Sequence, residues 1–265
     1  MTKELYNISA ADCLKLYPQI LANSNRNMQA GKLLAKNGLY GPAISLQITA
    51  LEEMIKCLIV LMDGNGFQLR KTKGVHRFFK EHGIRHYTAF ILLIVYLFGE
   101  DLTAKLELLI KAPQQLQYWL ELSKDEKRIE QWAEKYFGNK MAQLKSELPF
   151  FIDMDRQRTS GFYCDHELDF HSPEMISKEK YEYANLRITK VIALAKGFIS
   201  ASESQSPVMK KHKTDLLRYF KDNNIYDRLS QVFANRTGEL FGNIDIWLEY
   251  FKSSLMDSST RAGNN

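Results

Sequence analysis

Apolar residues recur along most of the chain at spacings of three and four, the period of an amphipathic α-helix. The densest apolar stretch runs from Gly41 to Met62, with Pro42 in the first turn, where proline is tolerated. Apolar side chains would cover nearly every face of this helix, as in the central helix of a bundle. We expect the helix to end at the turn sequence Asp63-Gly64-Asn65-Gly66.

Further helices are predicted on both sides of this central one. Ser9 can cap a first helix that Pro18 kinks or breaks, and a second apolar stripe ends near Asn37 and Gly38. The other predicted helices cover residues 76–81, 87–98, 102–122 with a break at Pro113, 126–136 after a capping box that begins at Ser123, 140–148, a long stretch after Pro173, 215–220, 226–235 and 240–255. We find no internal repeat and no convincing strand, so the pattern predicts an all-α bundle.

Composition shifts suggest how the chain is organised. Residues 1–200 read as one helical domain, and the serine-rich stretch 201–207 reads as a linker. A C-terminal helical extension would occupy residues 208–256, and residues 257–265 are expected to be a disordered tail.

The composition is that of a soluble globular protein. The chain has 265 residues, a formal net charge of +5, 45% hydrophobic and 25% charged residues. Its longest uncharged apolar run, Tyr87 to Gly99, is too short to span a membrane, and the three cysteines are too far apart for a disulfide framework or a cysteine zinc site. A cytoplasmic protein that does not associate with membranes is therefore expected, and composition alone indicates no function.

The central helix carries a charged sequence, Glu52-Glu53-x-x-Lys56. Charge within an apolar helix is costly unless it is paired. One interpretation is an ion-paired or solvated strip in which Glu52 contacts Lys56, four residues later. The other is that one of the two carboxylates orients a basic group in a polar pocket within the bundle.

Histidines follow in the next segment, after a basic run from Arg70 to Lys73. His76 and Lys80 would share a helix face, and an imidazole can act as an acid or a base near neutral pH. The alternative is a surface histidine on a basic helix. His82 and His86 also stand four residues apart, but Gly83 between them weakens the case for a helical metal pair.

A polar segment from Arg156 to His166 brings together the most chemistry-bearing residues. It contains Arg158, Tyr163 and Asp165 within a few positions. Arginine offers a rigid fork of donors that suits a phosphodiester, and tyrosine can stack on a base or donate its hydroxyl. An ordinary polar loop is the alternative. Acidic and histidine side chains between Asp165 and His171 match no metal motif that we can name, so we predict no metal site.

Three of these elements resemble the AbiV-type abortive infection family. The sequence from Leu33 to Lys56 resembles a small-residue helix that continues into Ala-Leu-Glu-Glu-x-x-Lys, and His76-x-x-x-Lys80 resembles a second family element. The segment from Arg158 to Asp165, followed by Pro173, resembles the family's basic-x-x-Gly-Leu-Tyr-Val-Asp sequence before a proline-initiated helix. The order and spacing of the elements fit, and the resemblance covers residues 10 to 200.

The resemblance implies a fold and an activity. The family belongs to the HEPN superfamily, so we expect an all-α, HEPN-like antiparallel helical bundle with additional C-terminal helices. Many HEPN proteins are metal-independent ribonucleases without a cofactor, in which an arginine is followed after four to six residues by a histidine. Two protomers commonly bring these motifs together, which implies a homodimer.

The resemblance also implies which residues form the site. Arg158 and Tyr163 fall at the two motif positions, so a tyrosine stands where a ribonuclease carries histidine. Tyrosine, with a pKa of about 10, is a poor base at neutral pH, so Glu53, His76 or His166 would have to supply the base. The predicted catalytic residues are Arg158, Tyr163, Asp165, Glu53 and His76. The predicted RNA-binding residues are Arg156, Arg158, Lys56 and Lys80.

Two other functions stay open. The tyrosine at the histidine position favours a non-catalytic phage-defence protein that blocks translation by binding a phage protein, RNA or the ribosome. A plain helical interaction scaffold would suit the serine-rich linker and the extra helices. Expected partners are a second copy of the chain, RNA or the translation machinery, and a phage-encoded activator.

Overall fold

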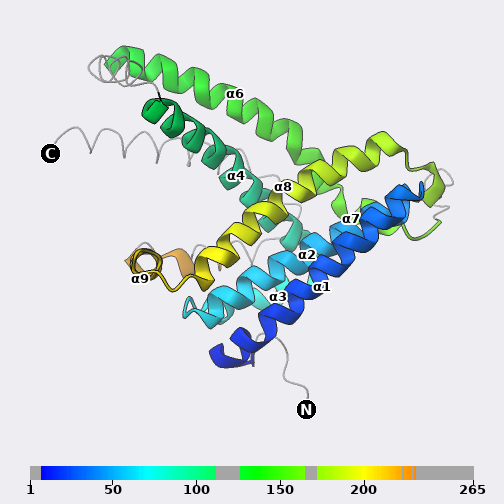
Figure 1. The fold of residues 1–265 in the computed structure, drawn as a ribbon, viewed down its shortest axis with the longest axis horizontal. Helices are drawn as coiled ribbons and strands as arrows, with labels where there is room; N and C mark the ends of the chain where they lie inside the picture. The colour runs from blue at the N-terminus through cyan, green and yellow to red at the C-terminus, as the bar shows by residue number, and fades with distance from the viewer. Residues whose placement is uncertain (1–6, 112–125, 165–171, 223, 228–229, 231–265) are drawn as a thin grey trace. The chain divides into compact units, whose positions relative to one another are not determined.

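A computed structural model describes residues 7–111, 126–164, 172–222, 224–227 and 230 (Figure 1). Every regular element in these ranges is a helix and none is a strand, which confirms the all-α prediction. No helix within them is both long and apolar enough to cross a lipid bilayer. The predicted helix 240–255 and the predicted tail 257–265 lie outside the described residues.

The chain divides into two compact units. The first contains residues 1–92 and 150–237, and the second contains residues 93–149 and 238–265. Two long helices, α4 (His82–Lys111) and α6 (Glu126–Ile152), each contribute to both units. This division differs from the predicted one, in which a single domain covers residues 1–200.

The centre of the first unit is α2 (Tyr40–Gly64). It contacts α1 (Ala10–Lys36), α7 (Met154–Ser160) and α8 (Lys178–Glu203), and in Figure 1 α1 lies antiparallel to it. Its side chains are buried on all faces, including the fully buried Ile44, Ile48, Leu51, Met54 and Ile55. The prediction of a central helix that ends at the Asp63–Gly66 turn is confirmed.

The first helix does not break at Pro18. It runs unbroken from Ala10 to Lys36 after a capping box in which the Ser9 hydroxyl accepts from the Asp12 amide at 3.1 Å. Packing along α2 compensates for the hydrogen bond that Pro18 removes. The approach is close, because a Cβ on Gly31 would lie 2.9 Å from the Ala43 carbonyl oxygen.

Three further predicted breaks are wrong. The α4 helix is continuous between the helices predicted at 87–98 and 102–122, and α6 continues through Gly138 and Pro149. A single helical glycine costs only about 1 kcal/mol, which the rest of a long helix compensates. Pro113 and the predicted capping box at Ser123 lie outside the described residues.

The last described helices are longer than predicted. The Ser177 hydroxyl caps α8 by accepting from the Lys180 amide, and α8 continues to Glu203. The predicted linker 201–207 is therefore reduced to residues 204–206, before α9 (Pro207–Asp222) begins. The short helix α3 (Val75–Lys80) lies where 76–81 was predicted, and two 3₁₀ turns, η2 (Leu69–Lys71) and η3 (Pro173–Met175), complete the described elements.

Candidate active site

A buried carboxylate on the central helix gathers four basic side chains. The side chain of Glu52 is 4% exposed, and its oxygens lie 2.7 Å from His82 Nδ1, 3.0 Å from an Arg85 terminal nitrogen and 2.8 Å from His86 Nε2. The Nε atom of Arg158 lies 3.7 Å from Glu52 Oε1. We call these five residues the Glu52 cluster.

Three of the four basic residues come from the first turns of α4. His82, Arg85 and His86 stand at positions i, i+3 and i+4, which share one helix face. Arg85 also donates to the carbonyl oxygens of Phe78 and Phe79 at 3.2 and 3.1 Å, at the C-terminal end of α3. Arg85 thus joins α3, α4 and the Glu52 carboxylate through one side chain that is 3% exposed.

The fourth basic residue is delivered by α7. The Ser45 hydroxyl on α2 donates to the Arg158 carbonyl oxygen at 2.6 Å. Three residues later Gly161 packs so closely on α2 that a Cβ there would overlap the Ser45 hydroxyl and the Gly41 carbonyl. The missing side chain at position 161 therefore permits the approach that places Arg158 beside Glu52.

The members of the cluster differ in their access to solvent. Glu52, Arg85 and His86 have side chains between 2% and 4% exposed, whereas the side chain of His82 is 39% exposed and that of Arg158 is 25% exposed. An imidazole and a guanidinium thus lie at the solvent-facing side of a buried carboxylate. These two groups are the ones that a substrate could reach.

The charges around Glu52 determine its ionisation. Burial raises the pKa of a carboxyl group, but the hydrogen bond from His86 and the charges of His86, Arg85 and His82 outweigh burial and lower the pKa of Glu52 to about 2. Burial, together with the charges of Arg85 and Arg158, lowers the pKa of His82 despite the opposite effect of Glu52. At neutral pH the carboxylate is therefore ionised and the His82 imidazole is neutral.

Two neighbours compete for the Nδ1 atom of His82. It lies 2.7 Å from a Glu52 oxygen, which can only accept, and 2.7 Å from an Arg85 terminal nitrogen, which can only donate. In the tautomer that donates to Glu52, the other nitrogen, Nε2, is unprotonated and can accept a proton from a substrate. A carboxylate that orients an imidazole in this way also stabilises the imidazolium that forms when the proton is taken.

The predicted carboxylate, Glu53, lies outside the cluster. It pairs with Lys56 at 2.5 Å and accepts from Asn23 at 3.3 Å. The expected Glu52–Lys56 pair is therefore wrong, because Lys56 reaches the nearer carboxylate on its own side of the helix. Glu52, not Glu53, is the carboxylate that orients basic groups within the bundle.

None of the other predicted site residues that the structure describes contacts the Glu52 carboxylate, whose partners are the four basic residues of the cluster. His76 and Lys80 are exposed on α3. Tyr163 is 65% exposed, and the Arg156 side chain is 71% exposed and pairs with Asp153. Asp165, like His166, lies outside the described residues.

Sequence reasoning missed most of the cluster. His82, Arg85 and His86 carried a usable signal, a basic helical face close in sequence to a helix with an unexplained glutamate. From the sequence we considered His82 and His86 only as a helical metal pair, which Gly83 weakened, and we assigned Arg85 no role. Because α4 begins at His82, Gly83 lies in the first turn, where it interrupts little helix.

Among the residues that the structure describes, no group of three or more His, Cys, Asp or Glu side chains is arranged to hold a metal ion. The groups that could take part in a reaction at this site are an ionised carboxylate, a neutral imidazole and guanidinium groups. These features define a helical bundle with a buried carboxylate–histidine–arginine site.

The comparison with protein families identifies the bundle. The family model of AbiV, a HEPN family, matches residues 12–193, a range that includes every member of the Glu52 cluster. The chain therefore belongs to the AbiV family of HEPN proteins. Membership of this family indicates a function in abortive infection. No curated protein and no solved structure matches the chain.

Proposed function

We propose that this protein is an antiphage abortive-infection effector that cleaves RNA as a metal-independent endoribonuclease, with its active site at the Glu52 cluster. One observation carries the proposal: a single buried carboxylate lies beside a solvent-accessible neutral imidazole and a solvent-accessible guanidinium, which also pairs with Asp155 at 2.9 Å. A base and a phosphate-binding cation side by side are what transfer of a phosphodiester to the neighbouring 2′-hydroxyl requires.

Each residue then has a defined part in the reaction. His82 Nε2 takes the proton of the 2′-hydroxyl, which attacks the phosphorus. Glu52 accepts from Nδ1–H and stabilises the resulting imidazolium. Arg158 neutralises the charge that develops on the phosphorane oxygens.

The leaving 5′-oxygen needs a proton, and Tyr163 is the donor that we propose. Its side chain is 65% exposed and it follows Arg158 by five residues on the same segment. A phenol serves better as an acid than as a base at neutral pH. This assignment gives Tyr163 a role that does not require histidine chemistry at the motif position.

The test uses purified full-length protein, total RNA and EDTA, with and without extract from phage-infected cells to supply an activator. Wild type should cleave RNA in EDTA, whereas His82→Asn and Arg158→Ala should lower the rate by about 100-fold or more. The matched control is His212→Asn, an exposed histidine on α9, which should cleave like wild type. Circular dichroism of each variant verifies its fold.

The same experiment also tests the alternative function, a phage-defence protein that binds its target without cleaving RNA. The tyrosine at position 163 favours a protein that blocks translation by binding without cleavage. RNA that stays intact even with infected-cell extract, while both variants lose phage protection in cells, would establish binding and refute cleavage. If both variants still protect cells, the Glu52 cluster has no part in defence.

We also propose that the active form is a homodimer in the cytoplasm. The pairing of two motifs into one shared site, which is common among HEPN proteins, supports this. Size-exclusion chromatography with light scattering should give twice the chain mass of 30.8 kDa. A monomer at the concentrations used for cleavage would contradict the shared site.

A further inference from the structure

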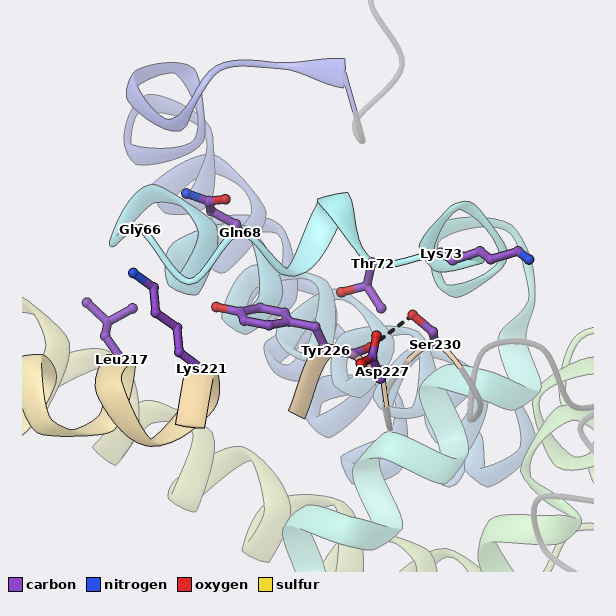
Figure 2. A pocket seen from close by; sticks show the side chains of 9 residues that line it. All are labelled: Gly66, Gln68, Thr72, Lys73, Leu217, Lys221, Tyr226, Asp227 and Ser230. Atoms are coloured by element: carbon purple, nitrogen blue, oxygen red, sulfur yellow. Dashed lines mark hydrogen bonds between the residues drawn. The ribbon is translucent and has the colours of Figure 1, made fainter. Parts of the chain in front are cut away.

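A second polar site lies within the first unit, where the loop after α2 faces α9. It is a pocket of about 490 Å³, a volume in the range of small-molecule sites. Figure 2 shows its lining, which includes Gln68, Thr72, Lys221, Tyr226 and Asp227. Two lining residues, Thr72 and Lys73, end the basic run Arg70–Lys73, to which the proposed ribonuclease reaction assigns no role.

Both walls of the pocket are held in place. The loop is anchored to the end of α2 because the Asp63 carboxylate accepts from the Arg70 amide at 3.0 Å. Across the pocket, the Lys213 ammonium on α9 donates to the Asn65 side chain at 2.6 Å. These contacts tie the loop to α2 and to α9 beside the pocket.

An aromatic ring in the wall is braced from behind. Phe67, which is 5% exposed, packs edge-on against Phe220 with ring centroids 5.3 Å apart. Phe220 in turn packs edge-on against Tyr226 with centroids 6.0 Å apart. The Tyr226 ring thus offers a fixed surface on which a planar group can stack.

The pocket is lined by one buried hydroxyl that has no hydrogen-bond partner in the described part of the chain. Thr72 is 6% exposed, and its hydroxyl has no hydrogen-bond partner there. In Figure 2 this hydroxyl points toward Tyr226, and the side chain of Lys221 extends toward Gly66. A buried hydroxyl without a partner is costly, so a ligand that supplies one would be favoured.

The lining selects among ligands. The Lys221 ammonium, for which the described residues provide no ion-pair partner, suits a phosphate. The Asp227 carboxylate repels a bare anion but accepts from hydroxyl or amino groups. A ligand that satisfies both, and that stacks on Tyr226, carries a phosphate, hydrogen-bond donors and a planar ring.

We propose that this pocket binds a nucleoside phosphate. The base stacks on Tyr226, the phosphate contacts Lys221, and the sugar hydroxyls or the base amino group donate to Asp227. The proposal is independent of the RNA-cleavage reaction, because the residues that carry it are not members of the Glu52 cluster.

The test is isothermal titration of the full-length protein with ATP, GTP, CTP and UTP, in EDTA. At least one nucleotide should bind saturably below millimolar concentration, and the matching nucleoside and inorganic phosphate should each bind about tenfold more weakly or not at all. Absence of binding by all four would overturn the proposal. Equal binding by inorganic phosphate would overturn the nucleoside assignment.

Variants then locate the bound nucleotide. Lys221→Ala should weaken binding about tenfold or more, because it removes a charged contact to phosphate. The matched control is Lys211→Ala, an exposed lysine elsewhere on α9, which should bind like wild type. Arg158→Ala should also bind like wild type, and loss of binding in that variant would place the nucleotide at the Glu52 cluster and refute this site.

Thr72→Val separates ligand binding from structural damage. Valine has nearly the same shape as threonine and removes a buried hydroxyl without a partner, so the unliganded variant should melt no lower than wild type. Its affinity for the nucleotide should nevertheless fall. A variant that binds as tightly as wild type would exclude Thr72 from the site.

Discussion

Replacement of Glu52 by glutamine should destabilise the protein far more than the same change at the adjacent Glu53. Glutamine keeps the shape of the side chain but removes its charge, so Arg85 and His86 would remain buried without an anionic partner. Removal of one partner from a buried ion pair typically costs 3–5 kcal/mol.

The pKa of Glu52 gives a second measure of the same loss. A decrease from 4.5 to about 2 corresponds to roughly 3 kcal/mol of stability at neutral pH. A carboxyl group whose pKa is lowered on folding stabilises the fold above its unfolded pKa and loses that contribution as the pH falls toward its folded pKa. The deficit of the Glu52→Gln variant should therefore shrink between about pH 5 and pH 2, to roughly 1 kcal/mol at pH 3.

Urea denaturation followed by far-ultraviolet circular dichroism at pH 7 and pH 3 measures both effects. Glu53→Gln is the matched control, since Glu53 pairs with a lysine that is 20% exposed, and it should lose less than about 1 kcal/mol at either pH. Equal losses in the two variants at pH 7, or a Glu52→Gln deficit that does not change with pH, would refute the electrostatic account of the cluster.

Three other predictions follow from local packing and ionisation. Gly161→Ala should lower the free energy of unfolding by about 2 kcal/mol and abolish most RNA cleavage, because its Cβ overlaps α2. Gly197→Ala, with open space around the new Cβ, should raise the free energy of unfolding by up to about 1 kcal/mol. Thermal melting and cleavage assays measure both variants, and equal effects would contradict the packing argument. The rate of RNA cleavage should rise with pH through an apparent pKa below 6.5 and then level off, because burial lowers the pKa of the general base His82. A pH–rate profile measures this pKa, and a midpoint above pH 7 would exclude His82 as the base. Iodoacetamide at pH 8 should alkylate the exposed Cys164 but not Cys57, because burial raises the pKa of the Cys57 thiol to about 12. Mass spectrometry of the labelled native protein measures this, and rapid labelling of Cys57 would contradict the prediction.

The hydrophobic periodicity of the sequence was sufficient to predict that the chain is helical and which helix lies at the centre of the bundle. An unbroken apolar surface from Gly41 to Met62 has few stable arrangements other than burial on all sides, so α2 could be placed at the core before any contact was known. The predicted breaks at Pro18, Gly138 and Pro149 were wrong for a common reason. Local propensity at one residue is worth about 1–3 kcal/mol, and the rest of a long helix can outweigh it.

The candidate site could be predicted only in part. The sequence identified Arg158 through its motif, and it marked the Glu52–Glu53 pair as charge in an apolar helix that needed a partner. It could not decide between the two carboxylates, because they differ by one residue, or about 100° around the helix axis. That rotation turns Glu52 toward α4 and α7 and Glu53 toward Lys56 and Asn23.

The sequence by itself determined an all-α chain and a buried central helix, because these depend on residue types at short, regular spacings, and its motifs resembled those of the AbiV family. The tertiary structure alone decided which basic groups share one carboxylate. Glu52 and His82 are 30 residues apart and Glu52 and Arg158 more than 100 apart, and no local pattern encodes such distances. The close packing of Gly161 on α2 and the start of α4 at His82 bring them together, and burial then sets their charges.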